Sequence, residues 1–140
     1  MRAEQLIVRD YERRHREYIK LRQSIIEGGG SGWQTESYRG NQRAASRTTE
    51  NRELRLERLE NLRWAKEMHA VEHARDRIGA GMPEEMRKQL RDAIMLNCSN
   101  GRRYPFERLY TVGISRRTFY RIRRGFLDDV AAELSRTQPK

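Results

Sequence analysis

The chain has 140 residues, a net charge of +10 and a mean hydropathy of −1.04. Charged residues make up 36% of the chain, the same share as hydrophobic residues. This composition allows one domain with a small core and argues against a large catalytic cleft. We therefore expect a binding protein rather than an enzyme, and a strongly positive chain attracts polyanions.

Arginine supplies 26 of the 30 basic residues. Its planar guanidinium group suits phosphates and guanine edges better than the point charge of lysine does. The single cysteine, Cys98, can form no disulfide within the chain, and we expect it to be a buried structural thiol. No signal-peptide pattern and no apolar run near about 18 residues is found, so we expect a cytoplasmic protein without a membrane span.

The first predicted element is a helix over residues 3–27, followed by the glycine-rich sequence GGGSG. We interpret residues 1–27 as an arm and residues 28–48 as a flexible linker. The apolar stripe of the arm packs within the chain or forms the seam of a homodimer, and the pattern leaves both open. The stripe consists of Ile7, Tyr11, Tyr18, Leu21 and Ile25.

A second helix is predicted from an N-cap at Thr49 to about Ile78. Its acidic and basic residues balance, and its apolar residues form no single stripe, which predicts contacts with more than one neighbour. A third helix is predicted from Pro83 to about Ser99, with Gly101 as a C-terminal stop.

The last two predicted helices form a helix-turn-helix within about residues 105–135. A short helix runs from Pro105 to about Thr111, Gly113 turns the chain, and Ser115 caps a helix that ends near Ser135. We therefore expect an all-α chain of about five helices. We expect residues 49–140 to form one helical domain, which binds DNA if the motif functions as one.

Positive charge is concentrated in this motif. Residues 102–124 contain eight arginines and one acid, Glu107, so their net charge is 8 − 1 = +7. Solvated helix faces usually mix the two signs, as residues 49–78 do. A one-sided positive field on a helix-turn-helix is typical of a protein that reads the major groove of double-stranded DNA.

Position along the last helix divides its polar side chains by role. Residues in the first two turns reach base edges, whereas flanking residues bind phosphates and set the register. The apolar residues Phe119, Ile122 and Phe126 face the preceding helix. We expect base reading by Arg116, Arg117, Thr118, Tyr120 and Arg121, and phosphate binding by Arg102, Arg103, Ser115, Arg123 and Arg124.

The C-terminal segment GISRRTFYRIRRGFLDDVAAEL resembles the sigma-factor region-4-like helix-turn-helix of phage transcriptional regulators of the RinA/ArpU type. The resemblance is specific over about residues 83–135 and architectural before them. It implies a bacteriophage or prophage protein that controls late transcription in a bacterial host, with RNA polymerase as a further partner. The matching positions are Ile114, Ser115, Thr118, Phe119, Ile122, Arg123, Arg124 and Ala132-Glu133-Leu134.

Three other functions compete with this one. A small-terminase-like subunit of DNA packaging is the alternative, although the motif of such proteins usually lies near the N-terminus. A nonspecific RNA binder would use aromatic stacking platforms, and only 8% of the residues are aromatic. His69 and His73 match the H-x-x-E-H pattern of inverted zinc proteases, but we interpret them as surface or packed histidines. We expect no catalytic residue, metal or cofactor.

Overall fold

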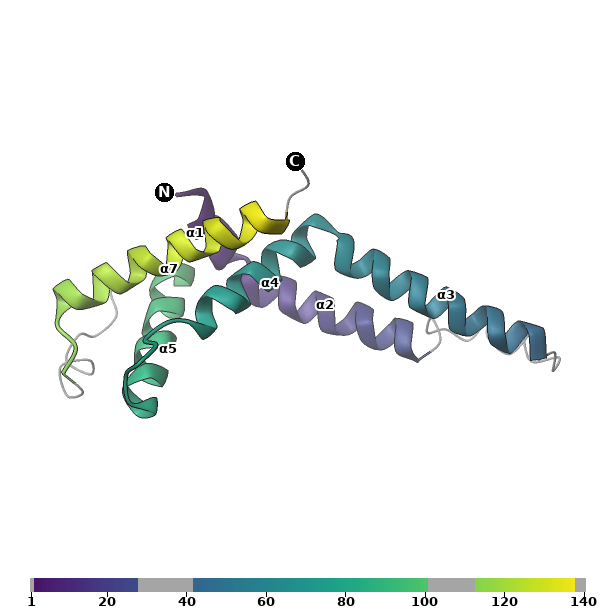
Figure 1. Cartoon of the computed structure of the whole chain (residues 1–140), viewed down its shortest axis with the longest axis horizontal. Helices are drawn as coiled ribbons and strands as arrows, with labels where there is room; N and C mark the ends of the chain where they lie inside the picture. The colour runs from purple at the N-terminus through teal and green to yellow at the C-terminus, as the bar shows by residue number, and fades with distance from the viewer. Residues whose placement is uncertain (1, 28–41, 101–112, 138–140) are drawn as a thin grey trace. The chain divides into compact units, whose positions relative to one another are not determined.

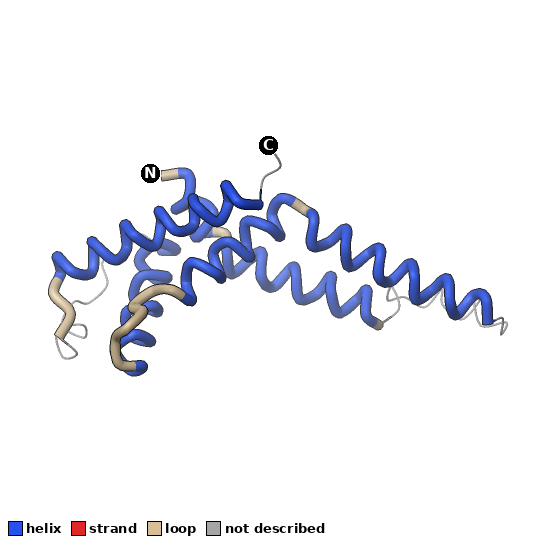
Figure 2. The backbone as a smooth tube through the Cα atoms, viewed as in Figure 1, coloured by secondary structure: helices blue, strands red, loops and turns tan. Residues whose placement is uncertain are grey.

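The computed structural model describes residues 2–27, 42–100 and 113–137. Within these ranges the chain forms six helices and no strand (Figures 1 and 2). The predicted all-α class is confirmed, with six helices instead of about five. The helices are α1 (Ala3–Arg9), α2 (Tyr11–Ile26), α3 (Gln42–Asn61), α4 (Arg63–Asp76), α5 (Glu84–Asn100) and α7 (Arg116–Thr137). None of these helices is both long and apolar enough to cross a membrane.

The predicted helix over residues 3–27 is interrupted at Asp10, so the expectation of one continuous helix is wrong. The backbone N–H of Asp10 still donates to the carbonyl of Leu6 at 3.1 Å, and α2 begins at the next residue. Aspartate is a weak helix former because its side chain competes for nearby backbone groups. The interruption divides the predicted arm into two helices.

The predicted helix from Thr49 to Ile78 also differs. It begins earlier, at Gln42, and divides at Leu62, whose N–H donates to the carbonyl of Leu59 at 3.2 Å in a tighter turn. Of the predicted linker over residues 28–48, the last seven residues therefore belong to α3. Residues 28–41 lie outside the described residues.

The third predicted helix is confirmed as α5, and a side chain from it closes the turn after α4. Arg87 donates from Nε to the carbonyl of Ile78 at 2.9 Å and from Nη2 to the carbonyl of Asp76. These carbonyls lie at and beyond the end of α4, where intrahelical partners run out. Gly79 in the same turn has φ +69°, and a Cβ there would lie 3.1 Å from Cγ of Arg87, which explains the glycine.

The chain divides into two compact units. The first consists of Met1–Glu12 and Glu67–Lys140, and the second of Arg13–Lys66. In the first unit α1 packs against α5 and α7, and α5 packs against α7 (Figure 1). Its buried apolar side chains are Val8, Tyr11, Met68, Ala70, Val71, Ala74, Ile78, Leu90, Ala93, Ile94, Cys98, Ile114, Phe119, Phe126, Leu127 and Val130.

Polar and aromatic contacts connect the helices of the second unit. Tyr18 of α2 donates its hydroxyl to a carboxylate oxygen of Glu60 in α3. The guanidinium carbon of Arg14 lies 5.9 Å from the ring centroid of Trp64, which is within cation–π range. Several large apolar side chains of this unit stay exposed, namely Ile19, Leu21, Ile26, Leu54 and Leu62.

We predict that Val8→Ala destabilises the first unit by about 2 kcal/mol, because Val8 is fully buried and its loss leaves a cavity between packed helices. Leu6→Ala is the matched control, since Leu6 lies on the same helix and is 48% exposed. Urea unfolding followed by circular dichroism measures both. Equal stability of the two variants would show that α1 adds nothing to the core.

Candidate nucleic-acid interface

The beginning of α7 has the local structure that its sequence predicts. Ser115 Oγ accepts a hydrogen bond from the backbone N–H of Thr118 at 3.2 Å, so Ser115 is the N-cap. Gly113 precedes it with φ +86°, in the left-handed region that favours glycine. The predicted first helix of the motif, residues 105–111, and the predicted phosphate ligands Arg102 and Arg103 lie outside the described residues. The complete helix-turn-helix therefore stays a prediction.

One face of α7 is buried. Phe119 is 0% exposed, Phe126 is 2% exposed and Val130 is 0% exposed, and their spacings of seven and four residues place them on one side of the helix. Ile114, just before the helix, is also buried at 1%. The predicted apolar stripe is confirmed at these positions, whereas Ile122 is only half-buried at its margin.

The first three turns of α7 also carry exposed side chains, which we call the arginine face: Arg116, Arg117, Tyr120, Arg121 and Arg124. At about 100° per residue, Arg117, Arg121 and Arg124 lie on the side of α7 away from Phe119 and Phe126, whereas Arg116 lies about 60° from Phe119 at the start of the helix. Four of the five predicted base-reading residues belong to this face, and the fifth, Thr118, is half-buried. The structure thus separates a core side and a cationic side on one helix.

The two neighbouring arginines predicted to bind phosphate differ in their surroundings. Arg124 is exposed, whereas Arg123 is half-buried and donates from Nε to Oδ1 of Asn97 in α5 at 2.7 Å. This hydrogen bond from Arg123 connects α7 to α5. Sequence reasoning missed this contact, because an asparagine 26 positions earlier gives no signal of its pairing.

The thiol of Cys98 lies at the same junction between α5 and α7. Cys98 is 2% exposed, which confirms the expectation of a buried thiol. Burial raises the pKa of this thiol, and the charge and hydrogen bond of Arg123 oppose that rise only in part. The thiol therefore stays protonated and unreactive at neutral pH.

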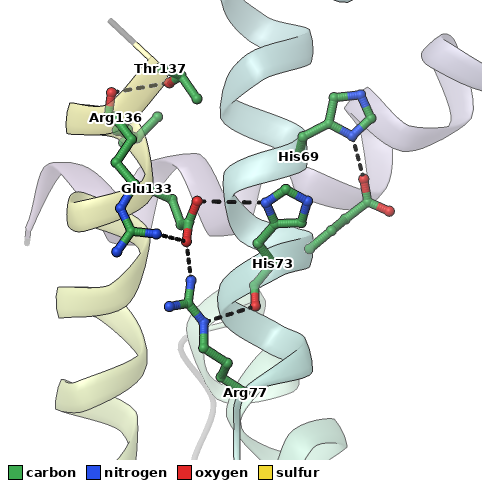
Figure 3. A network of polar contacts seen from close by, with 8 residues as sticks. His69, His73, Arg77, Glu133, Arg136 and Thr137 are labelled. Atoms are coloured by element: carbon green, nitrogen blue, oxygen red, sulfur yellow. Dashed lines mark hydrogen bonds and ion pairs between the residues drawn. The ribbon is translucent and has the colours of Figure 1, made fainter.

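A buried carboxylate holds the C-terminal half of α7 (Figure 3). Glu133 is 8% exposed, and its Oε1 accepts hydrogen bonds from Arg136 at 3.1 Å and from Arg77, which follows α4. Its Oε2 lies 3.6 Å from Nδ1 of His73. Burial alone would raise the pKa of Glu133, but the hydrogen bond and charge of Arg77, with the charge of Arg136, hold it below its ordinary value.

The two histidines of the H-x-x-E-H pattern contact different carboxylates. Nδ1 of His69 lies 3.0 Å from Oε1 of Glu72, whereas His73 faces Glu133 on α7 (Figure 3). In the part of the chain that the structure describes, no group of three or more histidine, cysteine or acidic side chains could hold a metal ion. His73 is part of the contact between α4 and α7.

Comparisons of the chain with protein-family models, with curated proteins and with solved structures found no match. The residues themselves are therefore the guide to function, above all the exposed arginines of α7.

We predict that Phe119→Ala lowers the free energy of unfolding of the first unit by roughly 3–5 kcal/mol, since the ring is fully buried. Tyr120→Ala is the control, because this neighbouring aromatic side chain is 39% exposed on the arginine face. Thermal and urea melts compare the variants. A Phe119→Ala protein of unchanged stability would show that the ring is not part of the core.

We predict that stability depends on pH through Glu133. Its pKa is lowered on folding, so the stabilisation is complete above the ordinary value of 4.5 and is lost as pH falls through the lower, folded pKa. The stability advantage of the wild type over Glu133→Gln should therefore be largest above about pH 4.5 and shrink below it. Urea melts at several pH values from about 3 to about 7 measure this difference.

The control for this prediction is Asp92→Asn, which removes an exposed carboxylate on α5. Its effect should be small at every pH. A gap between wild type and Glu133→Gln that stays constant down to the lowest pH would contradict the lowered pKa.

Proposed function

We propose that this protein is a sequence-specific double-stranded DNA-binding regulator of transcription, with the first turns of α7 as its recognition helix. The observation that supports this most is the arginine face, with four exposed arginines within nine residues of a helix whose other side is core. A recognition helix needs both properties, because it must be held rigidly while its side chains reach base edges.

Base reading is assigned to the N-terminal turns. Arg116, Arg117, Tyr120 and Arg121 are exposed there, and arginine binds O6 and N7 of guanine with two parallel hydrogen bonds. Thr118 is next to them and half-buried, so its contacts are restricted to bases close to the helix. Each bidentate arginine–guanine pair gives about 1–3 kcal/mol of discrimination.

Phosphate binding is assigned to the flanks. Ser115 is exposed at the N-cap and Arg124 is exposed one turn beyond the base-reading group. Arg123 combines a phosphate contact with its bond to Asn97, since Nε uses only one of the donors of a guanidinium group. Arg102 and Arg103, from the basic segment before the turn, complete the proposed set.

The resemblance to RinA/ArpU-type regulators extends the proposal to the control of late transcription in a bacteriophage or prophage. RNA polymerase of the bacterial host is then the second partner. Dimerisation through the exposed apolar residues of α2, such as Ile19 and Ile26, would give the two copies needed for a symmetric operator. Analytical ultracentrifugation separates a monomer or dimer from the ring of a small terminase subunit.

Selection of bound sites from random duplex DNA tests the proposal directly. A regulator of this kind enriches a defined motif, and its affinity for that motif exceeds its affinity for random duplex by a factor of about 10³ or more. Binding without an enriched motif would make the protein a nonspecific binder. Absence of binding at low salt would refute the proposed function.

We predict that Arg117→Ala lowers the sequence specificity of DNA binding, whereas Arg124→Ala lowers affinity for all sequences. Arg117→Ala should weaken binding to the selected motif by about 10-fold or more and leave binding to random duplex little changed, since a base contact is lost. Arg124→Ala should weaken both equally and lower the slope of log affinity against log salt by about one. Fluorescence anisotropy at several salt concentrations measures both effects.

Arg55→Ala is the matched control for these two variants. Arg55 is exposed on α3 in the second unit, so the substitution removes the same charge far along the chain from α7. It should leave motif specificity unchanged. Equal losses for all three variants would mean that only total charge matters and that the assigned roles are wrong.

A further inference from the structure

The arginine face of α7 continues into an acidic residue. Arg117, Arg121, Arg124 and Asp128 follow one another at spacings of four, three and four residues, so they share one side of the helix. The side chain of Asp128 is 64% exposed. It lies one turn beyond Arg124, which is about 6 Å along the axis. A carboxylate at this position would repel DNA phosphates bound by the arginine face.

The other end of the chain supplies a cation to this carboxylate. Arg2, just before α1, places Nη1 2.9 Å from Oδ1 of Asp128. Nε of the same guanidinium lies 3.5 Å from a carboxylate oxygen of Glu4. Packing of α1 against α7 brings this N-terminal residue to the continuation of the arginine face. The Arg2 guanidinium therefore places a positive charge next to the acidic residue that ends the stripe.

We propose that Arg2 is part of the DNA-binding surface, where it neutralises Asp128 and so keeps this carboxylate from repelling phosphates bound by the arginine face of α7. The inference rests on the proposed function and adds to it a residue from the opposite end of the chain. Its partner chemistry is the phosphate backbone of duplex DNA, and its role is to position and balance charge rather than to read bases.

The range of electrostatic interactions makes this effect measurable. The Debye length is about 10 Å at 0.1 M salt, so a carboxylate about 6 Å beyond Arg124 is felt by phosphates bound there. Removal of Arg2 leaves that carboxylate without its counter-charge. Exposed charge pairs contribute little to folding, so the effect should appear in DNA affinity and its salt dependence while stability stays nearly unchanged.

The experiment is a double-mutant cycle on full-length protein with a duplex of random sequence and with the selected motif. Arg2→Ala should weaken binding to both duplexes about threefold at low salt, an effect of the size expected for one exposed charge, and the loss should fade as salt rises. Asp128→Asn should bind at least as tightly as wild type. Arg2→Ala with Asp128→Asn should bind like the wild type, because the native pair and its double replacement both carry no net charge.

Arg9→Ala is the matched control, because Arg9 is an exposed arginine at the other end of α1. The inference is refuted if Arg2→Ala binds as tightly as wild type, if Arg9→Ala causes an equal loss, or if Asp128→Asn does not restore the affinity of Arg2→Ala. Failure of the wild type to bind any duplex would instead refute the proposed function. Thermal melts of each variant show whether a loss arises from unfolding.

Discussion

The first unit depends on one constraint, which is that α7 must be anchored firmly on one side while its arginines stay in water on another. Buried side chains such as Phe119 and Phe126 provide the anchor, each contributing about 1.5–3 kcal/mol by burial. Helices α1 and α5 supply surfaces against which α7 packs. Without that anchor, four like charges within nine residues would repel one another on an unsupported helix.

Polar contacts then fix the position and rotation of α7. In the first half of α7, Arg123 donates a hydrogen bond to Asn97. Near the end of α7, Glu133 contacts Arg77, Arg136 and His73 (Figure 3). These contacts are directional, unlike apolar packing, so they restrict rotation and sliding of the helix. Removing one member would leave a partly buried charge without its partner, which is costly.

The first residues of the predicted arm belong to the first unit. Val8 and Tyr11 belong to the core, and Tyr11 accepts a hydrogen bond from Arg75 of α4 at 3.2 Å while the guanidinium also lies 5.3 Å from its ring centroid. Residues at one end of the chain thereby stabilise the unit that carries the proposed recognition helix. The stability of that unit therefore depends in part on α1.

Much of α7 could be predicted from its sequence, because the information is local. A serine N-cap, a glycine with positive φ and apolar residues at spacings of three, four and seven lie within one short segment, so the cap at Ser115 and the buried side with Phe119 were both predicted. The excess of arginine over acid in the same segment is likewise a property of sequence alone. The all-α class followed from the same helical periodicities along the whole chain.

The tertiary structure decided what depends on distant partners. The breaks at Asp10 and Leu62 divide helices whose apolar spacing predicts continuity, because propensity differences of a few tenths of a kcal/mol are too small to place a break from sequence. The pairing of Arg123 with Asn97, of Glu133 with Arg77 and of Arg2 with Asp128 joins residues 26, 56 and 126 positions apart, the last from 128 − 2 = 126. Periodicity describes each helix by itself and contains no term for such pairs, so which arginines face solvent and which hold the helix in place is decided only by folding.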